Sequence, residues 1–200
     1  MRIIGIDPGL TRLGVGIVSS NGGRKLAFEH VEVMRSPATA ETPARLHQLG
    51  AAIERLLDGE RPDAIALERV FAQQNLPSVM GVAQISGVVM FLAEERGIPV
   101  TLYTPNEVKS QVTGYGAADK AQVTTMVTRL LGLAAPPQPA DAADALALAI
   151  THAWRLGRGS AGADPLRQAL AGATETPAQR AWREAEAKLG RRRSGPIGRS

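Results

Sequence analysis

The first 35 residues contain three strand-like segments in succession, with no helical segment between them. Residues 2–7 form an apolar run, and residues 13–20 alternate apolar with small residues. Residues 25–35 alternate again, after a hairpin signal at 21–23. Successive strands joined by such short turns pair antiparallel. The chain is therefore predicted to begin with an antiparallel meander.

The hydrophobic period changes after this meander. A helical pattern starts at Thr42-Pro43, and a short apolar strand ending in a carboxylate follows at 63–68. A helix between two such strands predicts a right-handed crossover to a parallel neighbour. Further segments are predicted as a strand at 99–103 and helices at about 78–96, from 105, 118–131 and 141–156. The order predicts an α/β fold with a five-stranded mixed sheet flanked by helices.

Charge is divided unevenly along the chain. Residues 1–154 carry 13 Lys and Arg against 15 Asp and Glu, whereas residues 155–200 carry 10 against 4. The second segment has Gly-, Pro- and Ser-rich stretches around one short predicted helix at 177–189. We predict a globular domain over 1–157 and a basic, flexible C-terminal tail over 158–200. The tail either binds a polyanion or aids solubility.

Composition excludes several classes of site. The chain has no Cys, which excludes disulfides, thiolate zinc sites and thiol nucleophiles. None of the four Lys follows a Gly in a phosphate loop, which excludes a P-loop nucleotidase. The longest apolar stretch, roughly 79–93, is shorter than the about 20 residues that span a membrane. These features predict a soluble cytoplasmic protein without membrane contact.

Carboxylates end two predicted strands and begin the last predicted helix. Asp7 and Glu68 each close an apolar strand, and parallel pairing would bring both to the same end of the sheet. Asp141 and Asp144 share one helix face, although acids at a helix start also suit the helix dipole. Four converging carboxylates need compensating cations, and hard oxygen ligands select Mg²⁺ or Mn²⁺. The hypothesis is metal-assisted phosphodiester hydrolysis with two ions at one site.

Three strings of sequence carry a resemblance to a known family. They are Ile-Gly-Ile-Asp-Pro-Gly-Leu-Thr-Arg-Leu-Gly at 4–14, Leu-Glu-Arg-Val-Phe at 67–71 and Asp-Ala-Ala-Asp-Ala-Leu-Ala-Leu-Ala-Ile-Thr-His at 141–152. Together they resemble the RuvC family of bacterial Holliday junction endonucleases, over roughly residues 1–156. The resemblance implies a ribonuclease-H-like fold. It also matches Asp7, Glu68, Asp141 and Asp144 to the family's catalytic, metal-binding acids.

The same resemblance implies a substrate and partners. Family members act as homodimers that cut two opposing strands of a four-way DNA junction and leave 5′-phosphate and 3′-hydroxyl ends. They work with the RuvA–RuvB branch-migration complex in DNA recombination and repair. The implied cofactor is Mg²⁺, two ions per active site, with Mn²⁺ able to substitute.

A polar loop follows Glu68 and contains Phe71, one of seven aromatic residues in the chain. An aromatic side chain in such a loop stacks on an unpaired base or anchors the loop in the core. The resemblance favours base contact at the junction centre. Gln73, Gln74 and Asn75 follow, and they read base edges or are simply solvated. The basic residue that related sequences often carry in this loop is absent.

Two of the four Lys, Lys109 and Lys120, flank a loop at 114–116 in a chain that otherwise uses Arg. The resemblance matches both to basic residues near the scissile phosphate, where a Lys clamps phosphate or stabilises developing charge. Ordinary solvated lysines are the alternative. Tyr115, between two Gly, is a candidate for DNA contact or a loop plug. Arg12 and Arg69 lie near catalytic positions in sequence and are not assigned a role.

The helix predicted at 78–96 is apolar on more than one face, so it is either buried or shared with a partner subunit. A two-fold dimer suits a two-fold substrate, and this helix is the expected dimer element. His152 lies eight residues, or about 12 Å, beyond Asp144 on the last helix, too far to ligate beside it. We expect His152 to be a helix-end residue.

Other functions are compatible with parts of the sequence. A non-catalytic junction-binding protein would be expected to lack at least one of the four acids, and none is missing. A sugar-kinase or actin-like ATPase shares the Asp-Pro-Gly start, but such proteins need two related domains around a nucleotide. A ribonuclease-H-like nuclease for RNA–DNA hybrids is the remaining alternative. The last helix and the Phe71 loop favour the junction endonuclease.

Overall fold

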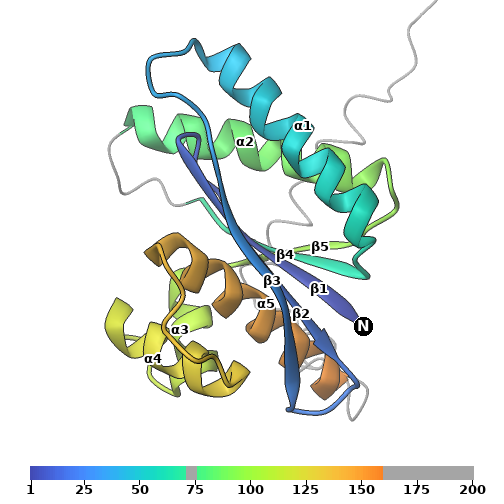
Figure 1. Cartoon of the computed structure of the whole chain (residues 1–200), viewed down its shortest axis with the longest axis vertical. Coiled ribbons are helices and arrows are strands. Elements are labelled where there is room, and N and C mark those ends of the chain that lie inside the picture. The colour runs from blue at the N-terminus through green and yellow to red at the C-terminus, as the bar shows by residue number, and fades with distance from the viewer. Residues whose placement is uncertain (71–75, 160–200) are drawn as a thin grey trace, which may run out of the picture. The chain divides into compact units, whose positions relative to one another are not determined.

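The computed structural model describes residues 1–70 and 76–159. They form a five-stranded sheet between two layers of helices (Figure 1). The strands are β1 (Arg2–Asp7), β2 (Arg12–Ser20), β3 (Leu26–Arg35), β4 (Ala64–Glu68) and β5 (Val100–Tyr103). The helices are α1 (Thr42–Glu60), α2 (Leu76–Glu94), α3 (Pro105–Thr113), α4 (Lys120–Leu131) and α5 (Ala140–Gly159). Phe71, Gln73, Gln74, Asn75 and the tail from 160 onward, with its predicted helix, lie outside the described residues.

The sheet has the strand order β3-β2-β1-β4-β5. The first three strands pair antiparallel, whereas β4 pairs parallel with both β1 and β5. The predicted mixed sheet is therefore confirmed. Because β1 and β4 run in the same direction, their carboxyl ends meet at one edge of the sheet, which is where ligands bind in open α/β folds.

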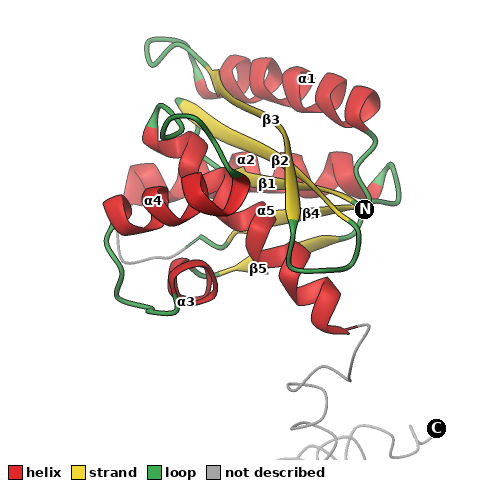
Figure 2. Cartoon of the chain, turned by 60° about the horizontal axis from the view of Figure 1, so that its bottom comes forward, coloured by secondary structure: helices red, strands yellow, loops and turns green. Residues whose placement is uncertain are grey.

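Alternation along the strands divides the core into two layers. On β1, Ile4 and Ile6 pack with α1 and α2, while Ile3 faces the opposite side. The opposite side is covered by α3, α4 and α5, whose buried residues include Val108, Val123 and a run of Ala and Leu from α5. Figure 2 shows the helices on both sides of the sheet. Each face of the sheet is thus buried under helices.

Glycine in the central strands lets α5 lie unusually close to the sheet. Gly5 of β1 and Gly16 of β2 are opposite each other, and both lie under α5. A methyl group on Gly5 would overlap the Ala145 carbonyl and come within 2.6 Å of the Ala149 backbone nitrogen. A methyl group on Gly14 would likewise overlap the backbone of Asp141. The small residues therefore set how near the acids of α5 come to β1.

The two helices that carry the candidate lysines begin at side-chain caps. Thr104 and Glu107 form the predicted capping box of α3, in which the Glu107 backbone N–H donates to Thr104 Oγ1 over 3.2 Å. Asp119 caps α4 and accepts from the Gln122 N–H at 2.8 Å, so this helix starts at Lys120 rather than at the expected residue 118. Within the described residues, no helix is long and apolar enough to cross a membrane.

Candidate active site

Asp7 and Glu68 are adjacent at the carboxyl ends of β1 and β4. Ile6 is opposite Leu67 in the parallel register, so the next residue on each strand is one of the two acids. Apolar side chains fill both strands up to that point, and the two carboxyl groups are close enough to share a hydrogen bond. The register thus places two acids side by side where the strands leave the core.

Burial makes this pair difficult to ionise fully. Burial, followed by the negative charges of Glu68, Asp144 and Asp141, raises the pKa of Asp7 to about 8. Burial also raises the pKa of Glu68, against the opposing effects of the Asp7 hydrogen bond and the positive charge of Lys120. At neutral pH the isolated chain therefore retains a proton on the Asp7–Glu68 pair.

Asp141 and Asp144 lie in the first turns of α5, and each contacts a cation. Lys120 Nζ donates to Asp144 Oδ2 over 2.9 Å, and this hydrogen bond raises the pKa of Lys120. Arg12 Nε lies 3.0 Å from Asp141 Oδ2. That oxygen is buried and accepts no hydrogen bond from the described residues, so its contact with Arg12 is an ion pair without hydrogen-bond geometry.

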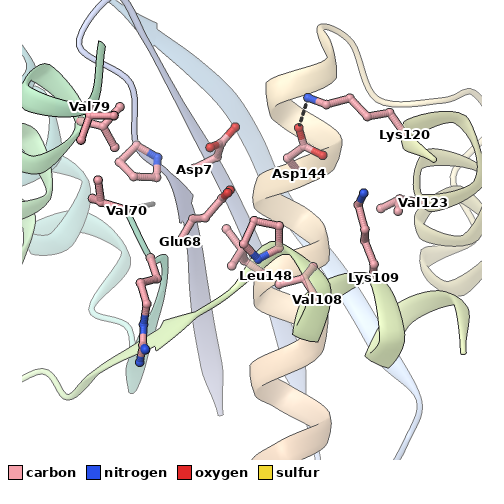
Figure 3. Close-up of a pocket in the computed structure, with 14 residues that line it drawn as sticks. Asp7, Glu68, Val70, Val79, Val108, Lys109, Lys120, Val123, Asp144 and Leu148 are labelled. Atoms are coloured by element: carbon pink, nitrogen blue, oxygen red, sulfur yellow. Dashed lines mark hydrogen bonds and ion pairs between the residues drawn. The ribbon is translucent and has the colours of Figure 1, made fainter. Parts of the chain in front are cut away.

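A pocket of about 400 Å³ brings together most of the predicted site residues that the structure describes. Asp7, Glu68, Asp144, Lys109 and Lys120 all line it (Figure 3). The figure shows the Asp7 and Glu68 carboxylates on one side and Asp144 bound to Lys120 on the other. The pocket thus combines three carboxylates with two ammonium groups.

Among residues 1–70 and 76–159, two of the predicted site residues do not line this pocket. Asp141 is absent from the lining, although its charge reaches Asp7 closely enough to raise that residue's pKa. Tyr115 is 63% exposed between α3 and α4, and its backbone contacts Thr113. A loop plug would be buried, so the exposure of Tyr115 leaves DNA contact as its remaining predicted role.

The donor chemistry of the four acids fits a hard divalent cation. Every donor is a carboxylate oxygen, and Asp141 Oδ2 is a buried oxygen that accepts no hydrogen bond from the described residues. In the arrangement observed, however, no three acids or His among residues 1–70 and 76–159 are close enough together to hold one ion. In the same arrangement, the carboxylates of Asp141 and Asp144 are each directed to a cation.

Two arginines to which the sequence assigns no role lie near the site. Arg69 lines the pocket directly after Glu68, and Arg12 pairs with Asp141 across 129 residues of sequence. A single sequence does not indicate which distant residue Arg12 pairs with. It does show that Arg12 follows the turn after the first strand that ends in an acid, which places it near the site.

The expectation that His152 ends the last helix is wrong. The helix α5 continues to Gly159, and His152 is 5% exposed, with its Nδ1 2.8 Å from the Tyr103 hydroxyl. Burial, together with the positive charge of Arg155, lowers the pKa of His152 to about 4. His152 is thus a neutral core residue at physiological pH, paired with Tyr103.

Comparisons with known proteins agree with this architecture. The family model described as crossover junction endodeoxyribonuclease RuvC matches residues 3–152. A protein of that name from Leifsonia xyli is 52% identical over 98% of this chain and 97% of its own length. Another from Streptomyces avermitilis is 60% identical over 78% of this chain and 88% of its own length.

Solved structures give the same result. Thermus thermophilus RuvC in complex with Holliday junction substrate is 37% identical, with a TM-score of 0.76, and the match covers 80% of this chain and 97% of that one. The yeast mitochondrial Holliday junction resolvase Ydc2 is 19% identical with a TM-score of 0.58, which shows a shared fold alone. The chain therefore belongs to the RuvC family of crossover junction endodeoxyribonucleases.

Proposed function

We propose that the chain resolves Holliday junctions by hydrolysing phosphodiester bonds on two opposing strands, in recombination and DNA repair. The observation that carries this proposal is the pocket in which Asp7, Glu68 and Asp144 lie with Lys109 and Lys120, in a chain of the RuvC family. Carboxylates and ammonium groups in one pocket suit a reaction on a phosphate group that requires metal ions.

Each residue of the pocket has a role in this proposal. Asp7 and Glu68 would hold a divalent cation at the sheet edge, and Asp141 and Asp144 would add ligands from α5. Two Mg²⁺ ions, or Mn²⁺ in their place, would supply activation of a water molecule and stabilisation of the leaving oxygen when bound there. Lys109 and Lys120 bind the phosphates that flank the cut and orient the scissile bond.

The substrate distinguishes this function from its alternatives. Strand-specific end labels report cleavage of a synthetic four-way junction, a linear duplex of the same sequence and an RNA–DNA hybrid, each with Mg²⁺ or EDTA. We expect cuts on the junction with Mg²⁺ and none on the duplex. Cleavage of the hybrid alone would identify a different nuclease on the same fold.

DNA contact is proposed for the loop after Glu68 and for the loop before α4. Phe71 stacks on an unpaired base at the junction centre, while Gln73, Gln74, Asn75 and Tyr115 contact nearby DNA. Phe71→Ala is expected to leave folding and dimerisation intact and to lower the cleavage rate of a mobile junction about tenfold or more, since stacking is worth about 1–3 kcal/mol. Phe28→Ala removes an exposed aromatic from β3 and serves as the control. Undiminished cleavage by Phe71→Ala would remove Phe71 from the site.

A homodimer through α2 completes the proposal. Three large apolar side chains of this helix, Met80, Met90 and Phe91, are 56%, 40% and 62% exposed. Large apolar side chains exposed along one helix are available to pack against a second copy of the chain. Two copies related by a two-fold axis would present one pocket to each of two opposing strands. The RuvA–RuvB complex is a proposed partner of this dimer. The basic tail from 158 onward is proposed to make an additional contact with DNA.

The dimer is tested by placing a charge on this face. Phe91→Asp is expected to shift the protein from dimer to monomer in analytical ultracentrifugation and to abolish paired cuts, because a buried unpaired carboxylate costs several kcal/mol. Phe28→Asp adds the same charge at a 39% exposed phenylalanine on β3 and should remain dimeric. A dimeric Phe91→Asp protein would place the subunit interface elsewhere.

A further inference from the structure

The two acids at the start of α5 are each held by a cation from a different part of the fold. Arg12 approaches Asp141 from the start of β2, with 3.0 Å between Nε and Oδ2. Lys120 approaches Asp144 from the first residue of α4, with 2.9 Å between Nζ and Oδ2. The carboxylates are 20% and 25% exposed, whereas the Arg12 and Lys120 side chains are 54% and 72% exposed. Each cation therefore has one contact inside the site and otherwise faces solvent.

The other two acids have no such partner among the described residues. Neither Asp7 nor Glu68 makes an ion pair within 4.0 Å with a cationic side chain of residues 1–70 and 76–159. Without metal the four acids are thus split into a pair on the sheet that has no cation and a cation-bound pair on α5. This split agrees with the finding that no three described acids gather around one point.

We infer that Arg12 and Lys120 compete with divalent metal for Asp141 and Asp144, and that DNA phosphates, by binding the same two side chains, release these carboxylates to the metal. This inference rests on the proposed function, since it assumes that the pocket receives both metal and DNA. It assigns Arg12 a role that neither the motif at 4–14 nor the pocket lining indicates.

At Arg12 the geometry makes the exchange physically inexpensive. The Arg12 contact lacks hydrogen-bond geometry, so breaking it loses Coulomb attraction without loss of a directed hydrogen bond. Guanidinium and ammonium groups that are mostly exposed reorient into solvent within nanoseconds. A phosphate offers each group an equivalent anionic partner. Metal and DNA would then bind with positive coupling, and the coupling is reciprocal by thermodynamic necessity.

A purely positioning role for Arg12 predicts the opposite result. If Arg12 served to orient Asp141 for the metal, removing the guanidinium would weaken metal binding. If Arg12 competes with the metal, removing it strengthens metal binding. The direction of the change therefore distinguishes the two roles without reference to enzymatic activity.

The test is a titration of the full-length chain with Mn²⁺ in the absence of DNA. Electron paramagnetic resonance measures the concentration of free Mn²⁺ at each point. Arg12→Gln is expected to lower the Kd for Mn²⁺ about fivefold, within the usual range of coupling between sites. Arg129→Gln removes an exposed arginine from the same domain, near the end of α4, and should leave the Kd unchanged. In an Asp141→Asn background the gain from Arg12→Gln should disappear, because the contested ligand is gone.

The same variant is then measured with DNA. In EDTA, Arg12→Gln should bind a four-way junction about threefold more weakly. The slope of the logarithm of the DNA-binding constant against the logarithm of the salt concentration should fall by about one, as loss of one phosphate contact requires. Tighter metal binding with weaker DNA binding cannot arise from partial unfolding, which lowers both. An Mn²⁺ affinity that is unchanged or weaker in Arg12→Gln would overturn the inference.

Failure of the inference differs from failure of the proposed function. If wild type cuts the junction and Arg12→Gln binds Mn²⁺ no more tightly, the function stands and the inference falls. If wild type binds Mn²⁺ yet cuts no junction, the proposed function falls, and with it the role of DNA in releasing the carboxylates.

Discussion

Asp7→Asn is expected to abolish junction cleavage, with a fall in rate of about 10³-fold or more, or about 4 kcal/mol of transition-state stabilisation. The carboxylate lies at the centre of the acid group, and its pKa responds to the charges of all three other acids. Asparagine keeps the shape of the side chain and removes its charge, so metal binding is lost while the fold remains. End-labelled junction cleavage with Mg²⁺ measures the effect.

The same substitution is expected to stabilise the metal-free protein at high pH. Burial raises the pKa of Asp7 from 3.8 to about 8, so between these values the folded chain keeps a proton that the unfolded chain has released. The free energy of unfolding of wild type therefore falls as the pH rises through this range. The asparagine side chain of the variant does not titrate, so its advantage should be near zero at pH 4 and should grow up to pH 8 by at most about 1.4 kcal/mol for each pH unit.

Urea unfolding in EDTA at pH 5 and pH 8 checks this dependence. Asp58→Asn is the matched control, because Arg96 holds the pKa of this exposed carboxylate below its usual value. Its replacement should bring no gain at high pH and should leave cleavage intact. A gain in Asp7→Asn that is equal at both pH values would contradict the account of the buried pair.

Gly5→Ala is the second large effect, and it acts through packing. The added methyl group would overlap the Ala145 carbonyl of α5, and backbone atoms there have no room to shift independently of the helix. Overpacking of this kind costs about 1–3 kcal/mol and displaces the helix that carries Asp141 and Asp144. We expect a lower urea midpoint and a cleavage rate reduced at least tenfold at a temperature where the variant is folded.

Gly23→Ala provides the control for this prediction. Nothing lies within 4 Å of a methyl group at Gly23, and its backbone does not require glycine. The substitution should change the unfolding free energy by less than about 0.5 kcal/mol and leave cleavage unchanged. Equal effects at Gly5 and Gly23 would mean that the close approach of α5 is not what positions its acids.

The sheet edge with Asp7 and Glu68 could be predicted because local signals determine it. Apolar runs that end in an acid define the strands, and the intervening helix requires a parallel crossover. The α3 capping box was likewise visible in four consecutive residues. The structure confirms these elements, since the patterns concern neighbours in sequence.

The contacts that sequence reasoning missed all join distant segments. Arg12 with Asp141 and Tyr103 with His152 depend on how α5 crosses the sheet, which no local pattern specifies. The sequence predicts the end of this helix at residue 156, before two glycines that disfavour helix, whereas α5 continues through both to Gly159. His152 was therefore predicted near the end of the helix, whereas it lies in a buried part of the helix.

The central claim is that this acid pocket makes paired, metal-dependent cuts. The most direct measurement is cleavage of a synthetic four-way junction by wild type and Asp7→Asn, with Mg²⁺ or EDTA, followed by DNA ligase. We predict symmetrical nicks on two opposing strands with Mg²⁺, sealed by ligase, and no nicks in EDTA or with the variant. Tight junction binding without cleavage in either Mg²⁺ or Mn²⁺ would contradict the claim and indicate a junction-binding protein.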